Sequence, residues 1–140
     1  NVPNVIPGEV TFNIDIRHQE DSVRKNTTES LKERLSVIAL RNNVEITMTT
    51  DWESNAVQFS EEVLNSMKNI VDKAGYSSME LYSGPGHDAK YMASVAETAM
   101  LFIPSKDGIS HNEAEFSTKE DIAKGTTVLL GVICDLAKAK

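Results

Sequence analysis

The sequence predicts an α/β protein with two lobes, the first ordered β-α-β and the second α-β-α-β-α. Three observations support this fold class. Residues near the N-terminus alternate between apolar and polar side chains, which is typical of a strand with one buried face. Three long stretches repeat apolar residues at helical spacing. A continuous apolar run over residues 99–103, closed by Pro104, is typical of a strand that is buried on both faces.

Composition indicates a globular protein and argues against nucleic-acid-binding and membrane-spanning proteins. The chain has 140 residues, of which 40% are hydrophobic and 25% charged, as in ordinary globular proteins. A net charge of −7 without a basic stripe argues against a nucleic-acid partner. We see no signal peptide and no apolar run long enough to cross a membrane. The only cysteine, Cys134, falls in an apolar helical pattern and is expected to be a buried, inert thiol. A cytoplasmic location fits these features.

The first lobe begins with two prolines and a glycine in residues 1–8, which exclude a helix there. Asp21 is expected to cap a helix that ends at Asn42-Asn43. Alternation over residues 44–52 predicts a second strand. A lobe with so few strands has unpaired edges, so we expect a further segment to pair with it. The first predicted strand places four apolar side chains on one face: Val10, Phe12, Ile14 and Ile16.

The second lobe follows a linker over residues 54–59. Ser60 is expected to cap a helix that Gly75 ends. A short strand is predicted over residues 79–82, and a short helix over residues 89–96. The buried strand over residues 99–103 comes next. Ser117 and Glu120 then form a capping-box pattern in front of a long final helix.

Two histidines lie in Gly- and Ser-containing loops that follow predicted strands. His87 comes after residues 79–82, and His111 after residues 99–103. If these strands are parallel neighbours, both loops open at the same edge, where α/β proteins bind ligands. Asp88, Asp107 and Glu115 would then lie near one crevice. The alternative remains that these loops contain only turn and capping residues.

The remaining candidates are a metal ligand and a carboxylate site. A catalytic metal needs about three protein ligands, and no His-x-x-x-His or Cys-x-x-Cys pattern is present, so His111 would be one ligand among others. Arg17 ends the polar face of the first predicted strand, and Asn4 lies in the loop before it. Together they could hold a carboxylate, although the pattern alone favours a solvated Arg17 on an open strand face. His18 is expected to be a surface residue.

Three motifs carry a resemblance to a known family: N-V-I-P-G-E-V-T-F-N-I-D-I-R-H over residues 4–18, S-G-P-G-H-D-A over residues 83–89, and F-I-P-S-K-D-G-I-S-H-N-E-A-E over residues 102–115. Together they resemble the C-terminal part of the N-carbamoyl-L-amino acid hydrolase and allantoate amidohydrolase family. These enzymes are dinuclear-metal amidases related to aminoacylases and zinc exopeptidases. The chain departs from the family at Pro85, where Ala is usual, and at Glu113, where Pro is common.

The resemblance implies a division of the chain and roles for its residues. Residues 1–53 would be the second half of a lid and dimerisation domain. Residues 60–140 would be the C-terminal segment of a zinc-exopeptidase-like catalytic domain. The implied substrate-binding residues are Asn4, Arg17 and His87; His87, with Gly86 beside it, would also stabilise the tetrahedral oxyanion, and His111 would be a metal ligand.

The resemblance also implies a reaction. Two divalent metal ions, zinc or manganese, would support hydrolysis of the C–N bond of a small carboxylate substrate, an N-carbamoyl-L-amino acid or allantoate. The other metal ligands and the general base belong to an N-terminal segment of the family, so this chain is expected to be inactive alone and to form a homodimer through the lid lobe. A non-catalytic association module is the alternative. A related aminoacylase or exopeptidase is disfavoured because it would not need the Asn4 and Arg17 pairing.

Overall fold

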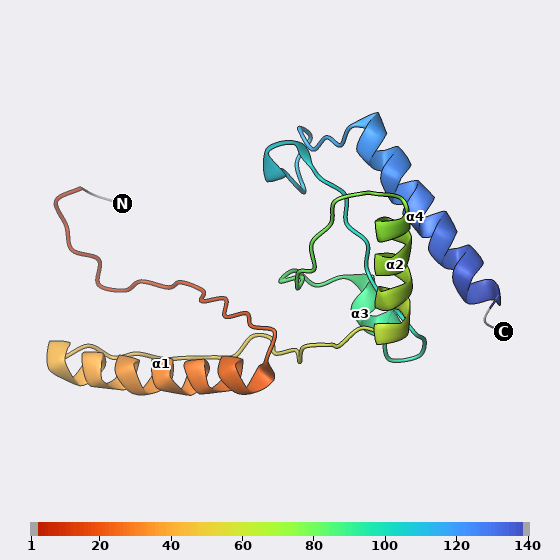
Figure 1. Ribbon diagram of the computed structural model, residues 1–140. Helices are drawn as coiled ribbons and strands as arrows, with labels where there is room; N and C mark the ends of the chain where they lie inside the picture. The colour runs from red at the N-terminus through yellow and green to blue at the C-terminus, as the bar shows by residue number, and fades with distance from the viewer. Residues whose placement is uncertain (1–2, 139–140) are drawn as a thin grey trace. The chain divides into compact units, whose positions relative to one another are not determined.

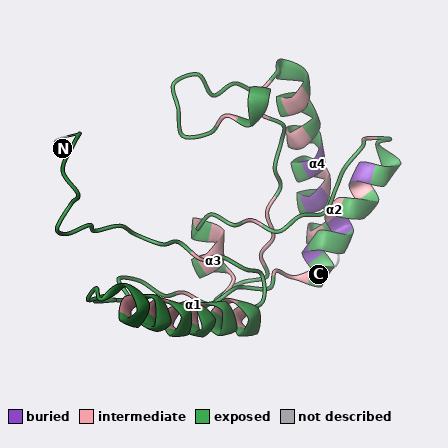
Figure 2. Cartoon of the chain, turned by 90° about the vertical axis from the view of Figure 1, so that its left-hand side faces the viewer, coloured by how far each residue is buried: buried purple, intermediate pink, exposed green. Residues whose placement is uncertain are grey.

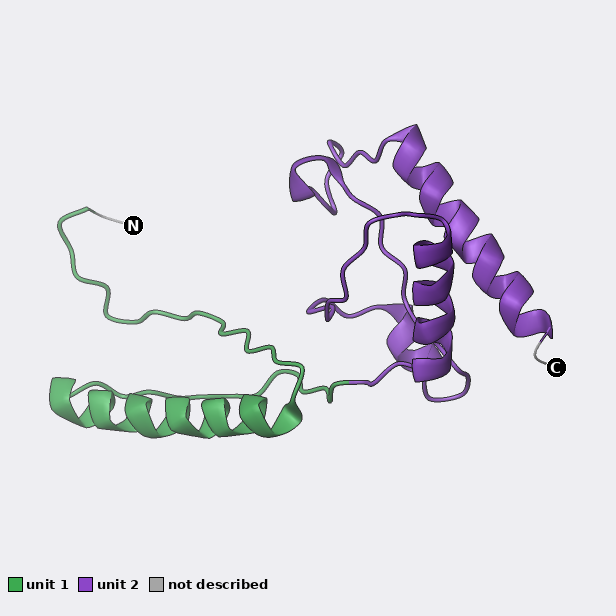
Figure 3. Cartoon of the chain, in the orientation of Figure 1, with its two compact units in different colours: residues 1–56 green, residues 57–140 purple. Residues whose placement is uncertain are grey.

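The computed structural model describes residues 3–138 and contains four α-helices and one 3₁₀ helix in that range (Figure 1). The chain divides into two compact units, residues 1–56 and residues 57–140 (Figure 3), and each unit is described by itself. The boundary lies within the expected linker at residues 54–59. The elements are α1 (Asp21–Asn42), α2 (Glu61–Lys73), α3 (Asp88–Met92), η1 (Lys106–Gly108) and α4 (Lys119–Lys138).

The strand predictions are wrong for this structure, since no residue from 3 to 138 lies in a β-strand. The segments predicted as strands are irregular instead. A strand exists only when a neighbouring strand pairs with its N–H and C=O groups. The backbone of Ser60 bonds to Thr98 (2.9 Å) and that of Lys106 to Phe116 (2.8 Å), but these are isolated links that do not extend into ladders. The α/β arrangement is therefore absent from the described part of the chain, which is helical.

The first unit consists of α1 and the irregular segments on either side of it. As predicted, α1 ends at Asn43, which adopts the left-handed conformation at φ 52°. Asp21 is the first residue of the helix and not its cap; its Oδ1 accepts a hydrogen bond from the backbone of Ala56 (3.0 Å). Arg24 forms an ion pair with Glu53 (2.9 Å). Residues 44–56 therefore leave the C-terminal end of α1 and return to its N-terminal end.

The first unit has no buried core: none of residues 3–56 is buried (Figure 2). Leu31 and Leu35, on the predicted apolar face of α1, are only half-buried. An amphipathic helix gains most of its stability from packing of that face. The apolar face of α1 therefore receives incomplete cover within its own unit.

The second unit has its core between α2 and α4. Four valines are buried there, and Figure 2 shows the buried positions of these two helices in purple. As predicted, Ser60 caps α2, with its Oγ accepting from the backbone of Val63 (3.4 Å), and Gly75 follows the helix with φ +69°. Ser66 Oγ donates to Asp135 Oδ2 across the same interface (2.6 Å). The core residues are Val63, Val71, Val128 and Val132.

The predicted capping box before α4 is wrong by one residue. Thr118, and not Ser117, caps the helix: its Oγ1 accepts from the backbone of Asp121 (3.0 Å) and donates to the carboxylate of Asp121 (2.7 Å). Ser117 Oγ instead donates to the carbonyl of Pro104 (2.8 Å). Ser and Thr are both suitable cap residues. Ser117 bonds to the distant residue Pro104, which leaves Thr118 to cap the helix.

The prediction of a buried thiol at Cys134 is also wrong, because Cys134 is exposed. The outward face of α4 carries apolar residues as well, including Leu130 and Ile133, which are 61% and 57% exposed. Apolar spacing alone therefore does not distinguish the buried face of this helix. None of the helices within residues 3–138 has the length and apolar character needed to span a membrane.

Candidate functional site

His87 lies in the loop that leads into α3 and is held on two sides. Its Nε2 lies 3.0 Å from the hydroxyl of Ser83, four residues earlier. Its ring meets that of Phe102 in a T-shaped arrangement, with the centroids 5.7 Å apart and the planes inclined by 66°. Both Ser83 and His87 are half-buried. A loop side chain with two such contacts has a restricted orientation, as a substrate-facing group requires.

Gly86, beside His87, adjoins open space. A Cβ built on Gly86 would have no atom within 4 Å apart from its chain neighbours, and the residue does not adopt a positive φ. The fold itself therefore does not require glycine here. The absence of a side chain leaves the backbone at this position accessible. The predicted role of the turn in substrate binding stays a prediction.

His111 lies in a second, tightly bonded loop over residues 104–117. Its φ is 55°, a left-handed value that costs free energy in a residue other than glycine. Its backbone N–H donates to Glu115 Oε2 (2.9 Å). Ser105 Oγ donates to the carbonyl of Ile109 (2.5 Å). These bonds hold His111 in a conformation that it would rarely adopt in a flexible loop.

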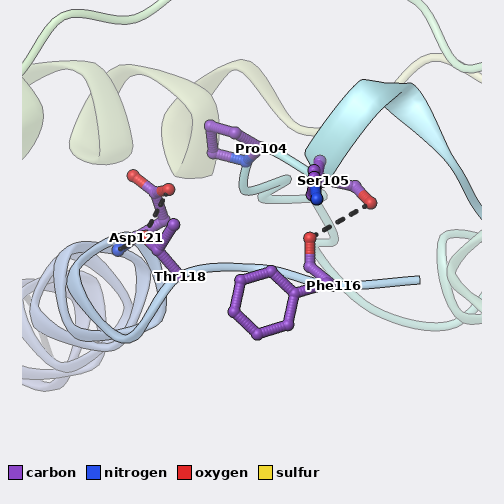
Figure 4. A pocket seen from close by; sticks show the side chains of 6 residues that line it. Pro104, Ser105, Phe116, Thr118 and Asp121 are labelled. Carbon is purple, nitrogen blue, oxygen red and sulfur yellow. Dashed lines mark hydrogen bonds between the residues drawn. The ribbon is translucent and has the colours of Figure 1, made fainter. Parts of the chain in front are cut away.

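A pocket lies at the base of this loop, next to the first turn of α4 (Figure 4). Three of its polar side chains already have partners within the protein: Thr118 and Asp121 bond to each other, and Ser105 lies within hydrogen-bond distance of the carbonyl of Phe116 (3.5 Å). The pocket therefore presents few groups that are available to bind a polar ligand. Its lining residues are Pro104, Ser105, Lys106, Phe116, Thr118 and Asp121.

The residues present do not complete a metal site. Within residues 3–138 there is no group of three or more His, Cys, Asp or Glu side chains that could hold a metal ion. The two histidines have separate surroundings, since His87 contacts Ser83 and Phe102 while His111 is held by Glu115. The expectation that both imidazoles lie with Asp88, Asp107 and Glu115 near one crevice stays a prediction.

Arg17 and Asn4 lie in the first unit, and both are exposed. Arg17 forms a two-pronged ion pair with Asp15: Nε lies 3.0 Å from each carboxylate oxygen, and Nη2 lies 2.5 Å from Oδ2. The hydrogen bond from Arg17, and then its charge, lower the pKa of Asp15, and Asp15 raises the pKa of Arg17. Sequence reasoning missed this partner. Asp15 and Arg17 share the polar face of the alternating segment, which was the available signal.

A model of the peptidase family M20/M25/M40 matches residues 3–135. The chain belongs to this family. The match includes all of the candidate residues, from Asn4 through Arg17, Gly86 and His87 to His111. As a member of the M20/M25/M40 family, the chain has the family's fold.

Relatives with known names confirm the resemblance to amidohydrolases. An N-carbamoyl-L-amino acid amidohydrolase from Geobacillus stearothermophilus is 36% identical over 137 residues, which are 98% of this chain and 34% of the relative. An allantoate amidohydrolase from Escherichia coli strain K12 is 32% identical over 140 residues, which are 100% of this chain and 34% of the relative. The chain therefore spans about a third of the length of these relatives.

A solved structure supports the same grouping. The crystal structure of an amidase of the hydantoinase/carbamoylase family from Burkholderia multivorans aligns with a TM-score of 0.80 and 35% sequence identity. The alignment covers 82% of this chain and 28% of that amidase. The chain is thus similar to a segment of that amidase.

Proposed function

We propose that this chain is the C-terminal part of an M20-family amidohydrolase that hydrolyses the C–N bond of N-carbamoyl-L-amino acids or allantoate. One observation carries this proposal: two relatives named for these activities match 98% and 100% of the chain at 36% and 32% identity. Residues 1–53 would belong to a lid domain that dimerises, and residues 60–140 to the catalytic domain. The location would be cytoplasmic.

Arg17 and Asn4 are proposed to bind the carboxylate of the substrate. A guanidinium recognises a carboxylate through two parallel N–H···O bonds, the geometry that Arg17 already uses with Asp15. Because Asp15 is itself a carboxylate, the substrate would compete with it for Arg17. Asp15 would thus keep the guanidinium oriented before the substrate arrives and would lower the affinity for weaker anions.

His87 is proposed to stabilise the oxygen that gains negative charge when hydroxide adds to the carbonyl carbon. Such stabilisation needs an N–H donor that is already oriented toward that oxygen. The contacts of His87 with Ser83 and Phe102 support this role, because they restrict the ring. Gly86 would let the scissile group approach the backbone of the same loop.

His111 is proposed to be one metal ligand, with the other ligands supplied from outside this chain. The bonded loop around His111 suits a ligand that must keep one orientation. Since no complete site exists in residues 3–138, we derive no reaction step through a metal. In the complete enzyme the metals would be two divalent ions, zinc or manganese, and the 140-residue chain alone would be inactive.

Ammonia release tests this function. The 140-residue chain and a form extended N-terminally to the length of its relatives would each be given N-carbamoyl amino acids or allantoate, with manganese or zinc. Only the extended form should turn over substrate. Turnover by the 140-residue chain at the same rate would contradict the proposal that it is an incomplete part.

Two variants of the extended form separate the roles. Arg17→Ala should raise KM without loss of metal, and His111→Ala should lower the metal content measured by elemental analysis. His18→Ala is the matched control, because His18 is an exposed histidine that bonds only locally, to the backbone of Glu20 (3.0 Å). Metal loss in Arg17→Ala, or an unchanged metal content in His111→Ala, would refute the assigned role of that residue.

A non-catalytic association module is the second candidate. It is favoured by the large apolar side chains that both units expose: Ile6 is 91% and Leu40 84% exposed, and Leu130 is 61% exposed. Such residues commonly mark surfaces that another segment or protein covers. Failure of the extended form to hydrolyse any of the named substrates would favour this candidate.

A further inference from the structure

The contact between Ser83 and His87 is built into one short loop. The hydroxyl and the imidazole are four residues apart, and Ser83 Oγ lies 3.0 Å from His87 Nε2. Both side chains are half-buried, so solvent competes less for this bond than on an open surface. The bond therefore fixes the Nε2 edge of the imidazole and leaves the Nδ1 edge pointing away from Ser83.

The Ser83 hydroxyl has two possible partners. Its Oγ lies 3.0 Å from His87 Nε2 and 3.4 Å from the carbonyl of Pro85, so the contact with His87 is the shorter one. The 3.0 Å distance fits two arrangements: the hydroxyl donates to Nε2, or an Nε2–H donates to the hydroxyl, which then donates to Pro85. The first arrangement places the hydroxyl proton in the shorter contact. A neutral imidazole that accepts at Nε2 carries its proton on Nδ1. His87 precedes α3 without a side-chain capping bond, so the helix does not use Nδ1.

Phe102 restrains the ring from a second direction. The edge-to-face geometry limits rotation of His87 about its side-chain bonds. The segment that carries Phe102 is itself held at both ends. Ala99 packs against the valine core, and Ile103 lies so close to α4 that a Cβ on Gly125 would come within 2.6 Å of its Cγ2. His87 is thus connected to the core through Phe102 and the residues on either side of the segment that carries it.

We propose that Ser83 and Phe102 are positioning residues for His87. Ser83 keeps the neutral ring in the form that carries its proton on Nδ1, and Phe102 keeps that N–H in one direction. The ring is thereby prepared to donate to an oxygen that gains negative charge. The link to catalysis rests on the function proposed above, whereas the effect on the ring itself does not.

Nitrogen NMR of the 140-residue chain labelled with ¹⁵N-histidine tests the effect on the ring. When the ring is neutral, the ¹⁵N shifts of His87 should show the Nδ1–H form in excess. Ser83→Ala should move these shifts toward those of His18, and Ser83→Thr, which retains the hydroxyl, should restore them. Phe102→Leu should shift the ring protons of His87, because the ring current of Phe102 is lost.

Ser94→Ala is the control, because Ser94 Oγ donates to the carbonyl of Tyr91 in the same unit (2.7 Å). It should leave the His87 signals in place. Unchanged ¹⁵N shifts of His87 in Ser83→Ala, or an excess of the Nε2–H form in the unaltered chain, would overturn the role of Ser83. Unchanged ring-proton shifts in Phe102→Leu would overturn the role of Phe102.

Kinetics of the extended enzyme test the link to catalysis. Ser83→Ala should lower kcat about tenfold, as expected for loss of about 1.4 kcal/mol of transition-state stabilisation, with KM changed less than about twofold. Ser83→Thr should recover most of kcat. A raised KM with an unchanged kcat would overturn the positioning role in catalysis. If the unaltered enzyme hydrolyses none of the named substrates, the proposed function fails, and the NMR result still decides the role of Ser83.

Discussion

Ser66 Oγ donates a 2.6 Å hydrogen bond to Asp135 Oδ2, and this bond joins α2 to α4 beside the valine core. Ser66 is the only buried polar residue among those that the structure describes, with 6% of its surface exposed. A buried hydroxyl without a partner is destabilising, so this bond supports the packing that positions both histidine loops.

Ser66→Ala should therefore destabilise the second unit by about 1–2 kcal/mol, since a hydrogen bond to a charged acceptor is lost. The measurement is the free energy of opening from hydrogen exchange of the α2 and α4 amides. Ser36→Ala is the matched control, because the Ser36 hydroxyl bonds only to Lys32 of its own helix (3.0 Å). Equal effects of the two variants on these amides would contradict the role of the bond between the helices.

Gly131 lets α4 approach α2 closely. A Cβ at this position would lie 2.8 Å from Ile70 Cγ2, so Gly131→Ala should cost about 1–3 kcal/mol in strain, although alanine regains about 1 kcal/mol in helix propensity. We expect a net loss of stability in urea unfolding. The added substitution Ile70→Ala should relieve the strain, so the double mutant should be less destabilised than the sum of the single mutants. Gly8→Ala is the control and should be neutral, because a Cβ at Gly8 would meet no atom within 4 Å. If the stability changes of Gly131→Ala and Ile70→Ala were additive in the double mutant, the clash would be excluded.

Arg17 controls the ionisation of Asp15. The pKa of Asp15 lies below its ordinary value of 3.8, chiefly because Arg17 donates hydrogen bonds to the carboxylate. Since the pKa is lowered in the folded state, the pair stabilises the fold above the ordinary pKa, and this contribution disappears as the pH falls through the lowered value. The pair is exposed, so its effect on stability should be small.

Arg17→Gln should raise the pKa of Asp15 toward 3.8, as measured by the carboxyl ¹³C shift during an acid titration. Arg41→Gln is the control, since Arg41 lies in the last turn of α1 and should leave Asp15 unchanged. A pKa of Asp15 that does not respond to Arg17→Gln would show that the pair does not persist in solution.

Thr118 caps α4, so Thr118→Ala should destabilise the first turn of that helix by about 1 kcal/mol. Thr118→Ser should retain most of the stability because it keeps the hydroxyl. Hydrogen exchange of the first α4 amides measures the effect. Glu120→Gln tests the capping box that the sequence pattern suggested and should have little effect; a larger loss in Glu120→Gln than in Thr118→Ala would restore that earlier assignment.

Local signals in the sequence predicted the helices well. The cap at Ser60, the stop at Gly75 and the left-handed end of α1 at Asn43 were all predicted, because a helix end depends on residues within about four positions. The residues of the candidate site were also named from loops and motifs. Their motifs led to the family that the M20/M25/M40 match confirms.

Contacts between distant residues decided the rest. Alternation and apolar runs predicted strands, but a strand also needs a neighbour, and no strand forms within residues 3–138. Burial also depended on distant contacts, since Cys134 lies in an apolar helical pattern but is exposed. The cap of α4 did as well: Thr118 caps the helix, whereas Ser117 bonds to Pro104.

The sequence by itself determined where α2 begins and where α1 and α2 end, which family the chain belongs to, and which histidines and arginine to examine. Only the tertiary structure decided what holds those side chains: Asp15 for Arg17, Ser83 and Phe102 for His87, and Glu115 for the backbone of His111. The physical reason is that composition and spacing record the preferences of neighbouring residues. A hydrogen bond or ring contact requires the folded backbone to bring two particular groups within a few ångströms.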